Sequence, residues 1–211
     1  MKVYAQDSLI LPQHSYQVIQ DTMTVESHGS VRVLGPILAR GNIWIQPKGS
    51  MLVSRDGQLT IQGSLSLLGT LSVEGSLTVR GSLMLHSYLM VDGTVSVMGP
   101  LTVCGILIIG GALTVQGHMT IEAEGSVIVD GTLTVQGRLN VRPRGQLNGR
   151  PPATLNVQGH FMEFPGQQEQ SLPSSHSKLG LAGMCRGGAD RGGFNRDGFN
   201  RGGFSTTVYT D

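Results

Sequence analysis

The sequence is poor in charge, in aromatic side chains and in cysteine. Of its 211 residues, 14% are charged and 5% are aromatic, against about 25% charged residues in an average domain. The net charge of +1 argues against a chain that binds polyanions through its overall charge. Two cysteines, Cys104 and Cys185, make neither a disulfide framework nor a metal-ligand set. We therefore expect two free thiols in a reducing compartment.

Long apolar runs are also missing. No stretch of about 18 apolar residues is present, so we expect no transmembrane helix. The first 12 residues hold one lysine and only a short apolar run at residues 9–11, unlike the basic start and longer apolar segment of a signal peptide. These features predict a cytoplasmic protein.

Glycine, in contrast, recurs with a regular period. It stands at positions 57, 63, 69, 75, 81, 93, 99, 105, 111 and 117, and only Ser87 interrupts the six-residue spacing. Each unit reads approximately Gly, Ser or Thr, Leu, Ser or Thr, Val. A fixed short period is the signature of a repeat architecture.

The unit itself predicts a short strand. Apolar and hydroxyl residues alternate with a period of two, which is typical of a strand with one buried face, and Gly permits the backbone angles of a tight corner. A helix is excluded because each Gly would cost about 1 kcal/mol. Such short strands become stable only when stacked on similar units. The chain is therefore predicted to be all-β, a single-stranded three-sided β-solenoid of hexapeptide-like units over residues 22–164, with about 18–20 residues per coil and about seven coils.

The irregular units support three units per coil. Two extra residues stand in the segments 26–29, 46–49, 122–125 and 142–145, and with three units per coil all four fall on one corner. A fifth insertion, at residues 54–57, falls on another corner. Insertions in solenoids collect on one edge. Residues 1–21 are expected to form an N-terminal cap.

Three-sided winding predicts which outward side chains stack on each face. The threonine face displays Leu38, Thr60, Thr78, Ser96, Thr114 and Thr134. The tryptophan face displays Trp44, Ser66, Met84, Thr102, Thr120 and Asn140. The apolar face displays Arg32, Leu52, Ser72, Met90, Ile108 and Ile128, flanked by Tyr88 and Ile106.

The apolar face is the candidate interaction surface. A contiguous exposed apolar stripe usually marks an interface, although a covering tail or N-terminal segment would explain it equally. The predicted self-association residues are Leu52, Tyr88, Met90, Ile106, Ile108 and Ile128. The two ends of a solenoid also present strand edges that pair with other chains unless they are blocked.

The C-terminal part has a different composition. Residues 165–185 are rich in Gln, Ser and Pro and are predicted to be a flexible linker. Residues 186–211 are predicted to be a disordered tail, because they bury too little apolar surface to fold. Arginine and phenylalanine recur there between glycines, at Arg186, Arg191, Phe194, Arg196, Phe199, Arg201 and Phe204. Such Arg-Gly-Gly segments resemble those of RNA-binding proteins, since Arg binds phosphate and Phe stacks on bases. The alternatives are a general partner-binding tail and a short strand at residues 205–209 that adds to a sheet edge.

The Gly-spaced Leu-Thr-Val units between two tails resemble the bactofilins, bacterial proteins that polymerise into filaments without nucleotide. The resemblance covers about two-thirds of the chain and is architectural. It implies a cytoskeletal or scaffold filament built by stacking solenoid ends.

Residues that could carry other chemistry are scattered. Hexapeptide acyltransferases share the unit length, but here Ser or Thr follows the Leu. Glu74, Asp92 and Asp130 share one column, where solubility is a simpler explanation than cation binding or glycosidase chemistry. The Thr ladder resembles that of ice-binding solenoids, but its neighbouring columns are mixed. We therefore expect no enzyme, cofactor, metal or small-molecule substrate.

The sequence favours a non-enzymatic structural or scaffold protein whose partner is itself, through the solenoid ends and the apolar face. One alternative is a module that binds RNA or an acidic partner through its tail. Another is a viral or surface fibre or shell component.

Overall fold

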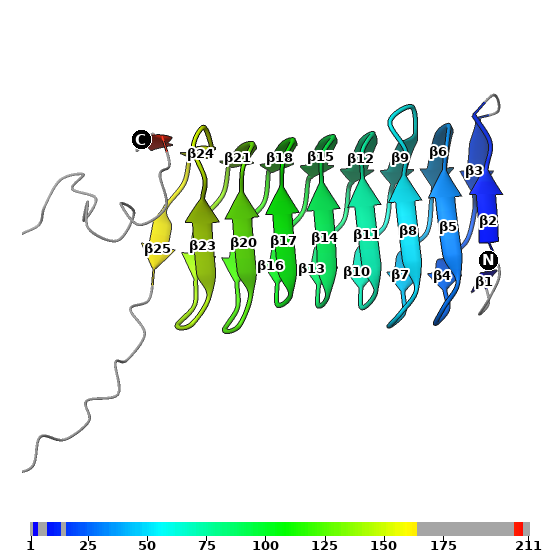
Figure 1. Ribbon diagram of the computed structural model, residues 1–211, viewed down its shortest axis with the longest axis horizontal. Coiled ribbons are helices and arrows are strands. Elements are labelled where there is room, and N and C mark those ends of the chain that lie inside the picture. The colour runs from blue at the N-terminus through cyan, green and yellow to red at the C-terminus, as the bar shows by residue number, and fades with distance from the viewer. Residues whose placement is uncertain (1, 4–7, 14–15, 164–204, 209–211) are drawn as a thin grey trace, which may run out of the picture.

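The computed structural model describes residues 2–3, 8–13, 16–163 and 205–208, and every regular element among them is a strand. Successive strands wind into a rod of stacked coils (Figure 1). Each coil contributes one strand to each of three parallel sheets. The three-sided β-solenoid predicted from the glycine period is therefore confirmed.

We name each sheet after the face it presents. The tryptophan sheet contains β1 (Lys2–Val3), β4 (Met23–Val25), β7 (Ile43–Ile45), β10 (Leu65–Leu67), β13 (Leu83–Leu85), β16 (Leu101–Val103), β19 (Met119–Ile121), β22 (Leu139–Val141) and β25 (Phe161–Glu163). The apolar sheet contains β2 (Ser8–Leu11), β5 (Ser30–Val33), β8 (Ser50–Val53), β11 (Thr70–Val73), β14 (Tyr88–Val91), β17 (Ile106–Ile109), β20 (Ser126–Val129) and β23 (Gln146–Gly149). The threonine sheet contains β3 (Gln17–Ile19), β6 (Pro36–Ala39), β9 (Gln58–Ile61), β12 (Ser76–Val79), β15 (Thr94–Val97), β18 (Ala112–Val115), β21 (Thr132–Val135), β24 (Thr154–Val157) and β26 (Ser205–Val208).

The register agrees with the predicted faces. Ser72 pairs with Leu52 on one side and with Met90 on the other, so a coil takes 18 residues without an insertion and 20 with one. Two insertions give 22 residues, from Leu38 to Thr60 and from Thr134 to Asn156, which exceeds the predicted 18–20. Tyr88 pairs with Ile106, beside the Met90 and Ile108 pair. All three columns of outward residues are therefore placed as the sequence predicted.

The rod is longer than predicted at its N-terminal end. The apolar sheet has eight strands, which makes eight coils, where the sequence predicted about seven. The difference arises because β2 and β3 continue the same sheets as β5 and β6. The segment predicted as an N-terminal cap thus supplies the first coil. Its side chains 8–11 alternate as those of later units do, but no glycine beat marks them.

The core is a set of stacked apolar columns inside the triangle. Leu71, Leu89 and Leu107 are each at most 1% exposed, and they stand in register on three successive coils. Of the residues whose burial the structure describes, no polar or charged one is buried. Apolar burial, which contributes about 25 cal/mol per Å², is therefore offset by no fully buried polar residue. At the level of single atoms, the Oδ1 atoms of Asp130 and Asn140 are buried without a hydrogen-bond partner and oppose it slightly.

The corner glycines serve close stacking. None of the glycines from Gly57 to Gly137 has φ in the left-handed region, so the backbone-angle explanation given above is wrong for them. A Cβ added at Gly93 or Gly111 would instead overlap the carbonyl oxygen of the glycine one coil below. At these two positions glycine is required because successive coils approach one another too closely for a side chain.

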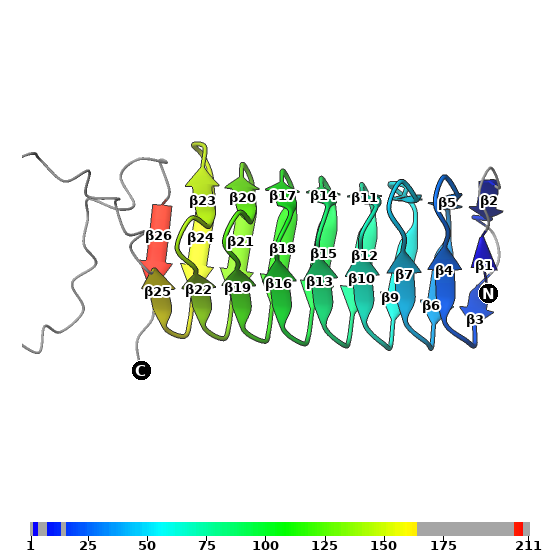
Figure 2. The ribbon, with the colours of Figure 1, turned by 90° about the horizontal axis from the view of Figure 1, so that it is seen from below.

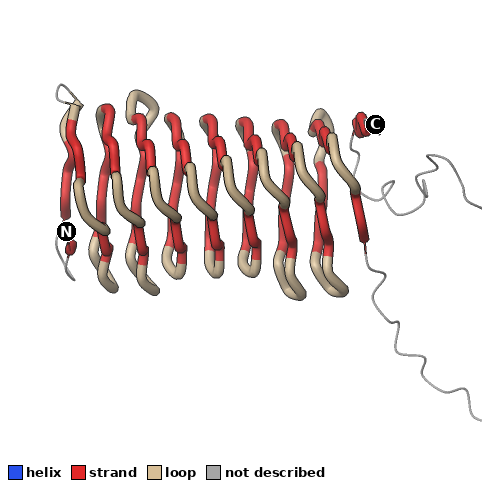
Figure 3. The backbone as a smooth tube through the Cα atoms, turned by 180° about the vertical axis from the view of Figure 1, so that it is seen from behind, coloured by secondary structure: helices blue, strands red, loops and turns tan. Residues whose placement is uncertain are grey.

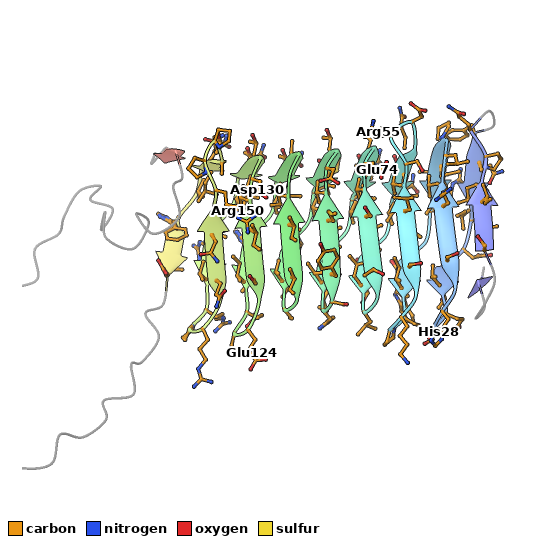
Figure 4. The ribbon with its side chains drawn as sticks, viewed as in Figure 1. His28, Arg55, Glu74, Glu124, Asp130 and Arg150 are labelled. Carbon is orange, nitrogen blue, oxygen red and sulfur yellow. The ribbon has the colours of Figure 1, made fainter. Side chains whose placement is uncertain are left out.

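The wide corner, between the tryptophan and apolar sheets, carries the four predicted insertions. Its loops are visibly longer in the two outer pairs of coils (Figure 3). In each insertion the third residue has positive φ, namely His28, Lys48, Glu124 and Arg144, with φ of 65–73°. The fourth residue donates its N–H to the carbonyl of the first, as in Gly125 to Glu122 at 2.9 Å. These are tight turns that project beyond the rod, and the labelled His28 and Glu124 lie along one edge (Figure 4).

Candidate assembly surfaces

The apolar face presents the predicted stripe across its middle coils. Ile106 is 45% exposed, and the other five residues of the predicted set are half-buried. From β8 to β20 no charged side chain projects from this sheet. Charged and amide groups begin only beyond it, with Arg32 at one end and Gln146 and Asn148 at the other. An apolar centre with polar ends is the usual anatomy of a protein interface.

A groove hollows one half of this face. It has a volume of about 520 Å³, and it runs over β2, β5, β8, β11 and β14. The small side chain of Ser72 lies between Leu52 and Met90 along the column, and Tyr88 donates its hydroxyl hydrogen to the Met90 sulfur at 4.0 Å. The face is therefore not flat, and a protruding side chain from a partner can enter it.

The N-terminal end of the rod exposes apolar side chains on its first coil. Ile10 is 57%, Tyr16 65% and Val18 38% exposed. The strands β2 and β3 each pair on one side only. Such an edge is a template for pairing with another chain.

The C-terminal end is stepped. The tryptophan and threonine sheets have nine strands each, and the apolar sheet has eight. Consequently β25 and β26 reach one step beyond β23 (Figure 2). Glu163, the last residue of β25, stands in register with buried Val141 and is itself exposed. A carboxylate thus ends a column that is apolar in every preceding coil from β4 onward.

The C-terminal strand is the edge strand that was one alternative for the tail, and it shows that the disorder predicted for residues 186–211 is wrong at residues 205–208. β26 pairs in parallel with β24, with Ser205 opposite Thr154 and Val208 opposite Val157. The predicted linker and the predicted Arg and Phe residues of the tail, from Arg186 to Phe204, lie outside the described residues.

The carboxylates of the predicted column are mostly paired across coils. Glu74 lies 3.9 Å from the Arg55 Nε, and Asp130 lies 3.9 Å from the Arg150 Nε (Figure 4). At these largely exposed positions each pair contributes at most about 1 kcal/mol. Among the described residues no group of three or more His, Cys, Asp or Glu side chains could hold a metal ion.

The surroundings of Cys104 and His118 account for these two residues in structural terms. Burial of Cys104, and secondarily the charge of Glu122, raises the pKa of its thiol, so the nucleophilic thiolate is disfavoured. The Nδ1 of His118 accepts a hydrogen bond from the backbone N–H of Arg138 at 3.0 Å. This bond ties one coil to the next.

Comparison of the chain with protein-family models, with curated proteins and with solved structures gives no match. The likeness to bactofilins therefore rests on the architecture alone. Within the described part of the chain, no helix is long and apolar enough to span a membrane.

Proposed function

We propose that this chain is a non-enzymatic structural protein that self-assembles through its ends and its apolar face. The observation that carries the proposal is the open construction of the rod. Three parallel ladders stop at unpaired edges, and one face presents an apolar stripe between polar ends. A protein built this way gains both hydrogen bonds and apolar burial from a second copy.

The apolar face is too small to hold two single rods together by itself. Seven spacings of about 4.8 Å between eight strands give a length of about 34 Å, and four-residue strands give a width of about 13 Å. The product is about 450 Å², below the roughly 800 Å² per partner of a stable complex. Lateral contact between two single rods is therefore weak. It becomes effective when rods joined end to end present several such faces at once.

The test compares matched substitutions on two faces. Ile106→Lys places a charge in the stripe, whereas Met84→Lys places it on the tryptophan face at nearly the same exposure, 45% against 43%. Light scattering of the full chain is expected to show a mass that rises with protein concentration. Ile106→Lys should lower that mass, and Met84→Lys should leave it unchanged. Equal behaviour of both variants would remove the apolar face from the proposal, and a constant single-chain mass for the unaltered protein would remove self-assembly itself.

The tail supports a second candidate function, binding of RNA. Its Arg-Gly-Gly-Phe composition suits phosphate pairing and base stacking. Four arginines, at positions 186, 191, 196 and 201, give an expected slope of log affinity against log salt of about −3 for single strands. Anisotropy of a labelled RNA with the full chain at several salt concentrations tests this candidate. Coil stacking has no comparable salt dependence.

A further inference from the structure

The two ends of the rod are not equivalent. At the N-terminal end the first coil leaves β2 and β3 without an outer partner. At the C-terminal end β26 pairs with β24 and so covers the edge of the threonine sheet. In the sequence, the 41 residues 164–204 separate β26 from β25. The chain thus supplies a strand to its own last coil at one end only.

We propose that β26 is a removable cap, and that its release opens the β24 edge to the first coil of a second copy. This inference rests on the proposed self-assembly. It assigns a strand-accepting site at β24 and a regulatory role to β26.

The winding shows why a second copy fits once the cap is gone. Without β26 the rod ends on β25, β23 and β24, so the next positions belong to the apolar sheet and then to the threonine sheet. Strands β2 and β3 of a second copy follow in that order. Strand β25 would take the place of β1, which has only two residues, beside β4 of that copy. Every neighbouring pair in the three sheets is parallel, and this junction preserves that direction.

The cap is suited to release because β26 is a four-residue strand whose only neighbour among the described strands of the sheet is β24. Thr206 and Val208 stand in register with buried Leu155 and Val157, so the ninth position of one core column is a polar residue type. A four-residue strand at the end of a long connection makes few bonds, and opening it disturbs no other described coil. Because residues 164–204 join β26 covalently to β25, a released strand stays tethered to the end it leaves and can rebind.

The direction of the hydrogen bonds provides a matched pair of variants. Backbone N–H groups point alternately to the two sides of a strand. Thr154 donates its N–H to the preceding coil, and Ser205 occupies the same position on the next strand. By this alternation the N–H of Thr207 faces β24, whereas that of Thr206 faces away. Thr207→Pro therefore removes a pairing bond, and Thr206→Pro puts the same ring where an edge strand tolerates it.

The first measurement is hydrogen exchange of the full chain, resolved by residue. Since the Thr154 N–H faces the preceding coil, the amides of Leu155 and Val157 face β26. We expect both to be protected in the unaltered protein and in Thr206→Pro, and to exchange at least about tenfold faster in Thr207→Pro. Amides of Leu133 and Val135, one coil inside, should keep their protection in all three. Equal exchange at Leu155 and Val157 in the unaltered protein and Thr207→Pro would overturn the cap.

The second measurement is the mass of the same proteins by light scattering. The apparent association constant for end-to-end joining is the constant of the uncapped protein multiplied by the uncapped fraction. A cap that is closed nine-tenths of the time therefore makes this constant about tenfold lower than in a protein with no cap. Thr207→Pro should reach half-assembly at a concentration about tenfold lower than Thr206→Pro. Faster exchange without increased mass would overturn control of assembly by the cap. It would leave lateral association through the apolar face, which Ile106→Lys tests separately.

Glu163 provides a second, independent test of the same junction. In the proposed junction its carboxylate would be buried beside Val25 of the second copy, and an unpaired buried charge opposes association. Glu163→Gln should therefore add to the effect of Thr207→Pro. Asp92→Asn removes the same charge from the middle of the rod and should not. Identical mass curves for Glu163→Gln and Asp92→Asn would contradict this junction.

Discussion

The tight corners and the wide corner of this rod turn the chain by different means. At the tight corners, which carry no insertion, the glycines do not adopt left-handed φ. A carbonyl oxygen of the coil below occupies the space that a side chain would need. At the wide corner His28, Lys48, Glu124 and Arg144 adopt left-handed φ although they carry side chains. Where coils stack closely, space selects glycine. Where two extra residues swing the chain outward, charged and polar residues are accepted despite an unfavourable backbone angle.

The largest expected effect comes from adding one methyl group at two adjacent glycines. At Gly111 the new Cβ would overlap backbone carbonyl oxygens of the coil below, whereas at Gly110 its nearest neighbour is the Asp92 Oδ1 at 2.9 Å. Gly111→Ala should destabilise the protein by about 3 kcal/mol or more, because backbone atoms cannot move aside without parting the coils. Gly110→Ala should change stability by less than about 0.5 kcal/mol. Urea unfolding with unchanged slope measures both, and equal losses would refute the stacking explanation.

A smaller effect of opposite sign is expected at the wide corner. Glu124 has φ of 73°, a conformation that costs an L-residue roughly 1–2 kcal/mol. Glu124→Gly removes this cost but adds unfolded-state entropy of about 0.5–1 kcal/mol, so a net gain of about 0.5 kcal/mol is expected. Glu124→Val should instead destabilise, because a β-branched residue tolerates this angle poorly. A loss of stability in Glu124→Gly, measured by thermal unfolding, would contradict the assigned strain.

Inserted corner residues also carry the ion pairs between coils. Arg142 lies 3.7 Å from Glu122, one wide corner above the other, and both side chains are substantially exposed. Arg142→Gln should cost less than about 0.5 kcal/mol, and the loss should shrink further in high salt because exposed charges are screened. Stability of both proteins at low and high salt measures it, and a loss above about 1 kcal/mol would show a stronger coupling than the geometry allows.

The weakest expected effect concerns Cys104, which stands in the wide-corner column. Burial raises the pKa of its thiol, with a smaller contribution from Glu122. The folded state therefore favours the neutral thiol, and the associated stability is lost as pH rises through the raised pKa. In a Cys185→Ser background, alkylation should be slower than in the unfolded chain, and Glu122→Gln should speed it slightly. Slower alkylation in Glu122→Gln would contradict the assigned sign.

The sequence predicted the fold and most of the register because the glycine period fixes both. Once Gly75 and Gly93 mark one corner, alternation of Leu and Val places every inward and outward residue between them. The first coil was missed because β2 and β3, within residues 8–19, form strands although no glycine occurs there to mark a six-residue period. A further turn at residues 150–153, closed by the Ala153 N–H donating to the Arg150 carbonyl at 2.8 Å, was missed because Ala153 stands where the other insertions have glycine. A strand at residues 205–209 was predicted as one alternative for the tail, but the sheet edge that it joins, β24, could not be predicted because the repeat ends long before it.

The candidate surfaces were predicted to a similar extent. The apolar stripe follows directly from the register, but its modest exposure depends on how neighbouring side chains pack. Ile106, for example, is 45% exposed, whereas Ile108 on the same strand is half-buried. The two ends differ because β26 pairs with β24 at one end and because Glu163 stands in register with buried Val141 there, and neither pairing follows from the glycine period.

The most direct test of self-assembly is sedimentation of the full-length protein over a wide range of concentration, with electron microscopy of the same samples. We expect species larger than one chain that grow with concentration, and rods longer than the single eight-coil unit. A single species with the mass of one chain at every concentration, and particles no longer than one rod, would contradict it.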